Sequence, residues 1–196
     1  MATTLVLARH GETDWNRDHR LQGWADPPLN ALGRAQALEL AAALDGERFD
    51  AVYSSDLQRA AETARIVASQ LGVPGVVEDV SLREVDLGSW SGRLWEEVTG
   101  RERPDGESRE QHRERVVSGV LRLAAAHDGQ TLLIVSHGGS LRALESFATG
   151  ETPRPLANCE TFRMLVDERG LTLLEAQPET PPREHEADDA EALGSG

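Results

Sequence analysis

The sequence predicts a three-layer α/β/α sandwich with a mostly parallel central sheet. Short apolar runs typical of buried strands occur around residues 5–8, 51–54 and 131–136. Segments whose apolar residues repeat at helical spacing lie between these runs, and strands that alternate with helices usually form a parallel sheet covered on both faces. Two further runs, 161–166 and 171–174, indicate a late pair of strands joined by a turn.

The first predicted strand ends abruptly in Arg9 and His10, followed by Gly11. In open α/β sheets, ligands bind at the carboxyl ends of strands. Arginine is a permanent planar cation that matches phosphate, and histidine supplies a nucleophile or an acid–base group near neutral pH. Gly11 lets the backbone turn sharply or approach a ligand closely. This strand end therefore indicates chemistry on an anionic group.

A polar loop over residues 14–28 precedes the first predicted helix. Asn30 is a suitable N-cap for a helix that runs to Leu44, and its spacing places Leu32, Leu40 and Leu44 on the inner face. The loop is expected to be a solvated connection that its tryptophans, Trp15 and Trp24, fix by packing.

The second strand, over residues 50–54, leads into a second helix. Ser55 and Gln58 have the spacing of a capping box, and apolar residues from Leu57 to Leu71 keep the helical period. Arg59 falls in the first turn, at the same sheet edge as His10, where the helix N-terminus favours anions.

The middle of the chain is less regular. Residues 76–80 are predicted to form a strand, residues 82–90 a loop built around Glu84, and residues 92–106 a short helix and loop. Ser108 is a suitable N-cap for a long helix over residues 109–126. That helix is expected to turn its apolar residues inward, namely Val116, Val120 and Leu123.

The run 131–136 is the strongest strand signal in the chain. It ends in His137, followed by two glycines and a helical pattern, and so resembles the opening strand in its arrangement. Arg9, His10, Arg59 and His137 can thus converge on one edge of the sheet. Two fixed guanidinium groups would answer the main requirement of a transferring phosphoryl group, whose negative charge is spread over three oxygens.

The composition narrows the expected partners. The net charge of −14 argues against nucleic acid and against anionic membranes, because both require a basic face. All 20 basic residues counted as Lys or Arg are arginine. The single cysteine, Cys159, excludes an internal disulfide and fits a reducing compartment. Since the sequence also has no signal-peptide core and no stretch long enough to span a membrane, we expect a cytoplasmic protein.

The length fits one domain, which we place at residues 1–176. From residue 177 to 196 the sequence is rich in proline, acidic residues and alanine and lacks an apolar pattern. We therefore expect this segment to be a disordered acidic tail.

Several motifs, in order along residues 3–166, resemble the signature of the histidine phosphatase superfamily, which includes the phosphoglycerate mutases. The first is Arg9-His10-Gly11-Glu12-Thr13-Asp14-Trp15-Asn16. The others are Leu21-Gln22-Gly23-Trp24, the segment 54–60, Leu82-Arg83-Glu84 and Ser136-His137-Gly138-Gly139. The resemblance implies the phosphoglycerate mutase-like fold and a phosphatase of small phosphorylated molecules that needs no cofactor.

The resemblance also implies the roles of single residues. His10 would be the nucleophile that forms a phosphohistidine, and Glu84 would protonate the leaving oxygen and later activate water. That role needs a carboxyl group with a pKa near the working pH, which burial beside the phosphate could produce. The remaining residues would bind the phosphoryl group or line the rim of its pocket, namely Arg9, Asn16, Gln22, Gly23, Arg59, His137 and Gly138.

Other readings of these residues remain. His10, His137 and Glu84 form a His/His/carboxylate set, but two arginines facing the same cavity would repel a divalent cation, so no metal is expected. Neither a Gly-x-Gly-x-x-Gly motif nor a P-loop is present. A non-catalytic phosphate-binding module on the same fold is a second alternative. Such a module could lose His10, Glu84 and His137 without penalty, so the presence of all three argues against it.

The third alternative is a cofactor-dependent phosphoglycerate mutase. The mutase branch has an insertion after the acid glutamate, with lysine, tyrosine and arginines that grip the substrate carboxylate. Here the segment 85–106 has no tyrosine and the whole chain no lysine, which favours the phosphatase branch. Arg17, Arg20 and the loop 104–108 are candidates for the outer pocket. The substrate and the oligomeric state stay open, a homodimer included.

Overall fold

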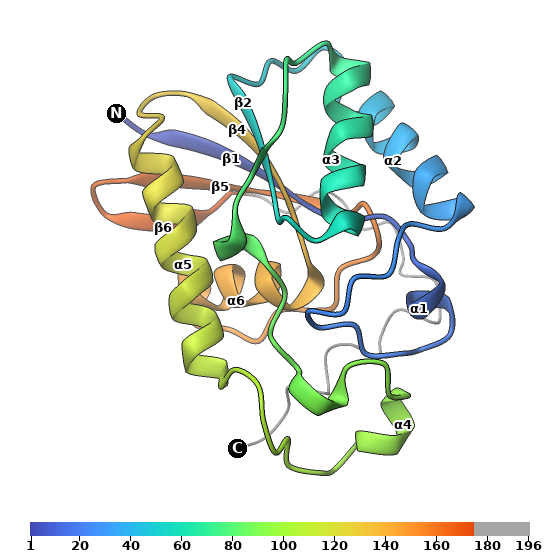
Figure 1. Ribbon diagram of the computed structural model, residues 1–196. Coiled ribbons are helices and arrows are strands. Elements are labelled where there is room, and N and C mark those ends of the chain that lie inside the picture. Colours follow the sequence, from blue (N-terminus) through green and yellow to red (C-terminus); the bar gives the residue numbers. More distant parts are fainter. Residues whose placement is uncertain (175–196) are drawn as a thin grey trace.

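The computed structural model describes residues 1–174 and confirms the predicted α/β class, with a six-stranded sheet at its centre (Figure 1). The strand order is β3-β2-β4-β1-β5-β6, in which β1 to β4 are parallel and β5 and β6 antiparallel to their neighbours. The strands are β1 (Thr3–Arg9), β2 (Ala51–Ser54), β3 (Val77–Glu78), β4 (Thr131–Ser136), β5 (Thr161–Asp167) and β6 (Gly170–Leu173).

Helices cover both faces of the sheet, because the central strands are apolar on both sides. In β1, Val6 and Ala8 pack with α2 (Ala31–Ala43) and α3 (Gln58–Leu71). Leu5 and Leu7, on the opposite face, pack with α5 (Arg109–Ala125) and α6 (Gly138–Thr149). Figure 1 shows α2 and α3 on one side of the strands and α5 and α6 on the other. Two short helices, α1 (Asp14–Arg17) and α4 (Trp95–Val98), lie in the loops.

The register of the parallel strands determines which residues meet at the sheet edge. In the β1–β4 pair, Arg9 lies opposite Ser136, so His10 and His137 follow side by side. The other neighbour of β4 is β2, whose Ser54 lies opposite Val135, and α3 starts just after it. The carboxyl ends of three neighbouring strands therefore bring together residues that are far apart in sequence.

Two local predictions about the helices are wrong. Leu32 does not face the core, since it is 39% exposed. The capping box at Ser55 and Gln58 does not form: α3 begins at Gln58, and Leu57 occupies the N-cap without a side-chain bond. The Gln58 amide instead donates to Asp26 across the loop, and the Ser55 hydroxyl accepts from the Leu57 N–H.

Other predicted boundaries hold to different degrees. Asn30 and Ser108 cap α2 and α5 as predicted, each accepting an N–H from the first turn. The strand predicted over residues 76–80 is limited to β3, because a 3₁₀ turn begins at Val80.

The predicted acidic tail, 177–196, lies outside the described residues. Within residues 1–174, none of the helices combines the length and apolar character that a membrane span requires.

Candidate active site

A pocket opens at the carboxyl edge of the sheet, where β1 and β4 end and α3 and α6 begin. Most of the site residues predicted from the sequence line it, namely Arg9, His10, Gln22, Gly23, Arg59, Glu84 and Gly138. The structure therefore brings together residues from the N-terminal strand, two loops and two helix starts.

His10 is almost fully buried, with 3% of its surface exposed. Its Nδ1 lies 2.7 Å from the carbonyl oxygen of Gly11, so Nδ1–H donates to that oxygen and the lone pair of the neutral ring stays on Nε2. Burial, followed by the charges of Arg59 and Arg9, holds the pKa of His10 well below its usual value. The ring is therefore neutral at neutral pH and has a free nucleophilic nitrogen.

The two arginines are buried and held by backbone carbonyls. Arg59, in the first turn of α3, donates to the carbonyl oxygens of Ala25 and Gly23, each at 2.8 Å. Arg9, at the end of β1, donates from Nη1 to the carbonyl oxygen of Leu156. Because these contacts fix the guanidinium planes, the positive charges are in place before any anion arrives.

His137 lies beside His10, with 5.2 Å between the ring centroids. Its side chain is fully buried, and neither ring nitrogen has a hydrogen-bond partner within residues 1–174. Burial, then Arg59, His10 and Arg9, hold the pKa of His137 well below its usual value. Since buried polar atoms are normally paired, a neutral ring with unpaired nitrogens next to two arginines suits an anion that would accept its N–H.

The carboxylate of Glu84 closes the other side of the pocket. Oε1 accepts the N–H of Val85 and Oε2 that of Gly139, both at 2.9 Å. Burial raises the pKa of Glu84, but His112, the two amides and Arg142 outweigh it, so the pKa lies below its usual value. The expectation of a pKa near the working pH concerned the carboxyl group beside a bound phosphate, and it stays a prediction. Without phosphate, His112 and the two amides stabilise the carboxylate.

The polar loop after β1 contributes unequally. Gln22 and Gly23 line the pocket as predicted, but Asn16 is not among the lining residues. Its Oδ1 accepts the N–H of Thr13, and together they form a capping box at the start of α1. Gly11 permits a close approach to Gly33 of α2, because a Cβ there would lie 2.4 Å from the Gly33 oxygen.

The candidates for the outer pocket, namely Arg17, Arg20 and the loop 104–108, are not among the lining residues. Arg17 is exposed and pairs with acidic neighbours in its own loop, and Arg20 donates to the carbonyl oxygen of Gly92. Arg142 of α6 lines the pocket instead. A sequence signal for it exists, since Arg142 follows Gly138 by four residues and so shares its helix face.

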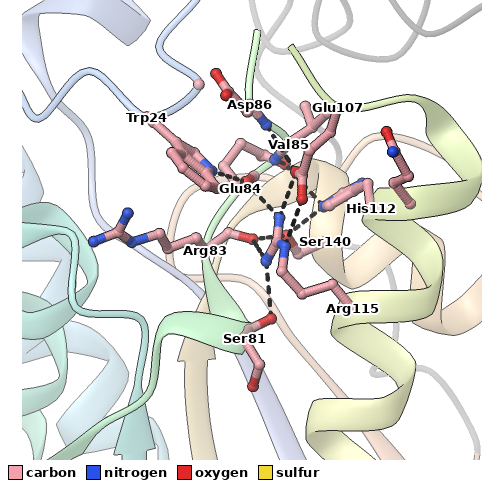
Figure 2. Close-up of polar contacts among 12 residues, drawn as sticks. Trp24, Ser81, Arg83, Glu84, Val85, Asp86, Glu107, His112, Arg115 and Ser140 are labelled. Carbon is pink, nitrogen blue, oxygen red and sulfur yellow. Dashed lines mark hydrogen bonds and ion pairs between the residues drawn. The ribbon is translucent and has the colours of Figure 1, made fainter. Parts of the chain in front are cut away.

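Trp24 was predicted to fix its own loop, 14–28, by packing, but it is 38% exposed and instead connects that loop to the segment that carries Glu84. Its Nε1–H donates to the carbonyl oxygen of Glu84 at 2.8 Å, and the guanidinium of Arg83 stacks 4.9 Å from its ring centroid. Figure 2 shows this contact together with the polar residues that surround the loop.

Arg9, Arg59, neutral His10 and the Glu84 carboxylate line one pocket. His137, which the sequence also predicted for the site, lies beside His10 but is fully buried and is not among the lining residues. Two fixed arginines next to a neutral histidine and a carboxylate are a set that suits the binding of a phosphoryl group. Within residues 1–174, there is no group of three or more His, Cys, Asp or Glu side chains that could hold a metal ion.

Comparison with known proteins identifies the family. Residues 5–185 match the histidine phosphatase superfamily (branch 1), and the chain belongs to this superfamily. It is 38% identical over 160 residues to the metal-independent phosphoserine phosphatase of Arabidopsis thaliana, a match that covers 72% of this chain and 67% of that protein.

Two further relatives cover more of the chain. The 2,3-bisphosphoglycerate-dependent phosphoglycerate mutase of Brucella canis is 34% identical over 181 residues, covering 82% of this chain and 88% of that protein. The structure of YhfR from Bacillus stearothermophilus superposes with a TM-score of 0.81 at 30% identity, covering 93% of this chain and 98% of that one. The family match and these relatives support phosphatase or mutase activity.

Proposed function

We propose that this protein is a metal-independent phosphatase that hydrolyses small phosphomonoesters through a phosphohistidine on His10. The observation that carries the proposal is the state of His10. Its ring is buried and neutral, Nδ1 is bound to the Gly11 carbonyl, and two fixed arginines stand beside it. A neutral Nε2 next to preorganised positive charge is what attack on a phosphoryl group requires.

In the first step, the Nε2 lone pair of His10 attacks phosphorus and the bond from phosphorus to the ester oxygen breaks. Arg9 and Arg59 stabilise the charge on the phosphoryl oxygens, and His137 donates an N–H to one of them. Glu84 gives a proton to the leaving oxygen. Because Glu84 is a carboxylate in the free protein, it gains that proton when substrate binds: the phosphate charge raises its pKa, and a monoanionic ester can bring the proton.

In the second step, Glu84 accepts a proton from a water molecule that attacks the phosphohistidine. The bond between nitrogen and phosphorus breaks, inorganic phosphate leaves, and the lone pair returns to Nε2 of His10. Splitting the displacement in this way replaces one difficult step by two easier ones.

Hydrolysis is favoured over phosphoryl transfer between two hydroxyl groups. After Glu84 the chain forms a compact segment in which Val85, Leu87, Trp90 and Val98 pack together with Leu21. Val85 and Leu87 of this segment line the pocket. We expect so compact a segment to leave the pocket open to water, which then competes for the phosphohistidine. The name of the Arabidopsis relative, a metal-independent phosphoserine phosphatase, agrees with the proposal. The Brucella mutase, at 34% identity, keeps mutase activity as the second candidate.

The covalent step can be tested directly. Brief reaction with a ³²P-labelled phosphomonoester, quenched in alkali, should leave label on His10 that acid removes. His10→Ala should lose both label and turnover. Near-normal turnover by His10→Ala would overturn the proposed nucleophile.

The reaction class can be tested with a panel of small phosphomonoesters. We expect phosphate release from several of them and negligible interconversion of 2- and 3-phosphoglycerate. Efficient interconversion with little free phosphate would establish the mutase. Saturable binding of phosphate with no turnover of any ester would establish the non-catalytic module.

A further inference from the structure

We propose that Arg115 and Glu107 are positioning residues that hold Glu84 at its place in the pocket. This inference rests on the proposed role of Glu84 as the proton donor and acceptor. It concerns the motif at residues 106–108 and the helix that follows, which the proposed mechanism leaves unused.

The segment that carries Glu84 has little regular structure of its own. It lies between two short 3₁₀ turns, Val80–Leu82 and Gly88–Trp90, and belongs to no strand. Its backbone carbonyl groups therefore need partners from elsewhere in the chain. The position of the Glu84 carboxylate depends on those partners.

Arg115 of α5 supplies most of them. Its Nη1 donates to the carbonyl oxygens of Ser81 and Arg83, and its Nη2 donates to that of Glu84, each at 3.0 Å. Figure 2 shows the guanidinium of Arg115 at the centre of this network, facing the backbone of the segment. A single side chain thus donates hydrogen bonds to three carbonyl groups within four residues, and one of these is the carbonyl group of Glu84 itself.

Glu107 completes the arrangement. Its Oε1 accepts from Nε of Arg115 and its Oε2 from Nη2, both at 2.7 Å. Oε2 also accepts the N–H of Asp86, and the backbone N–H of Glu107 donates to the Asp86 oxygen, both at 3.0 Å. Glu107 therefore fixes the segment on the far side of Glu84 while it neutralises Arg115.

The geometry uses every donor that arginine has. A guanidinium carries five N–H groups in a rigid plane, and Arg115 directs them to three carbonyl oxygens and both oxygens of Glu107. The pair is largely buried, with side chains 20% and 17% exposed. Lysine, with three donors on a flexible stem, cannot reproduce this plane.

A second side chain holds the same segment, at a carbonyl oxygen that Arg115 also binds. The Ser140 hydroxyl donates to the carbonyl oxygen of Arg83 at 2.8 Å and lies 3.0 Å from Nε2 of the buried His112. Proton transfer requires the carboxyl group to be within hydrogen-bond reach of the ester oxygen, and a displacement of about 1 Å can cost on the order of 100-fold in rate. Loosening the Arg115–Glu107 pair should therefore weaken proton transfer specifically.

The test compares two esters that differ in their need for a proton. Glycerol 2-phosphate releases a basic alkoxide, which must be protonated, whereas 2,4-dinitrophenyl phosphate releases an anion that is stable without a proton. For Arg115→Lys we expect kcat/KM for the alkyl ester to fall about 10- to 100-fold and that for the dinitrophenyl ester by less than about 3-fold. In a Glu84→Ala background, Arg115→Lys should cause no further loss.

Glu107→Gln keeps the shape of the side chain and is the second variant, to be used if Arg115→Lys does not fold. It should also lower kcat/KM selectively for the alkyl ester, by a smaller factor. The matched control is Arg113→Lys on the same helix, because Arg113 is exposed and pairs with Glu110 on the surface. This control should leave both esters unaffected.

Equal losses for the two esters, or a further loss in the Glu84→Ala background, would show that the pair is merely structural and would overturn the inference. The proposed function fails in a different way. If Glu84→Ala lowers kcat/KM for both esters by the same factor, Glu84 is not the proton donor. The inference about Arg115 and Glu107 is then also wrong.

Discussion

Gly139 offers a sharp test of the site because a side chain there would collide with Glu84. It is the second residue of α6, and its N–H binds Oε2 of Glu84. A Cβ at this position would lie 2.3 Å from Oε1 and 3.0 Å from Cδ of Glu84. Ordinary contact begins near 3.4 Å, so Gly139→Ala must displace the carboxyl group by about 1 Å.

The expected effects follow from that displacement. Activity towards an alkyl phosphate should fall on the order of 100-fold, because the carboxyl group no longer reaches the ester oxygen in line. Losing the bond to the carboxylate should cost about 1.5–3 kcal/mol of stability. Alanine in a helix offsets about 1 kcal/mol of this, since glycine is the poorer helix former. The free energy of unfolding should therefore fall by about 0.5–2 kcal/mol.

The Glu84→Ala background should reverse the sign of the stability change. The atoms of Glu84 that a Cβ at position 139 would meet are then absent, and only the gain in helix propensity remains, about 1 kcal/mol or less. Urea unfolding of the four proteins in this double-mutant cycle measures the change, and hydrolysis of glycerol 2-phosphate measures activity. If Gly139→Ala destabilises both backgrounds equally, the contact between Gly139 and Glu84 does not exist.

Three further predictions concern charge and protonation. Arg59→Gln should lower kcat on the order of 100-fold. Because Arg59 lowers the pKa of His10, the acidic limb of the pH profile of kcat/KM should also move to higher pH. An unchanged acidic limb would show that Arg59 does not lower the pKa of His10. Thermal stability should fall as the pH drops below about 6.5, since the unfolded histidines take up protons that the folded His10 and His137 resist. Melting curves from pH 8 to 5 at constant ionic strength measure this, and His137→Asn should flatten the slope. Hydrolysis should survive EDTA, whereas activity lost on chelation and restored by zinc or manganese would revive the metal site.

Local sequence patterns were sufficient for the long strands and for most helix starts, but not for β3, which is shorter than predicted. The run that forms β4 contains four consecutive apolar residues, Leu132 to Val135, all of them buried, as is typical of a strand covered on both faces. Asn30 and Ser108 cap helices through their own side chains. The capping box at Ser55 fails because the competing partner, Asp26, comes from a distant loop, and spacing along the chain cannot report such a contact.

The same distinction applies to the site. Arg9, His10, Arg59 and His137 stand at strand ends or helix starts, so their common edge follows from the parallel topology once the strands are recognised. Glu84 lies in a loop, and only the family resemblance singled it out. The lowering of its pKa depends first on His112, then on the amides of Val85 and Gly139 and on Arg142. Of these groups only Val85 belongs to its own segment.

The sequence by itself thus determined the fold class, the sheet edge at which the site forms and the chemical types gathered there, because periodicity and strand ends are local properties of the chain. Tertiary structure alone decided which polar groups meet across the pocket. It placed Arg142 in the lining rather than Arg17 or Arg20, and it brought Arg115 to the carbonyl groups around Glu84. The reason is that a side chain's partner is set by the packing of α5 and α6 against the sheet, which no short stretch of sequence encodes.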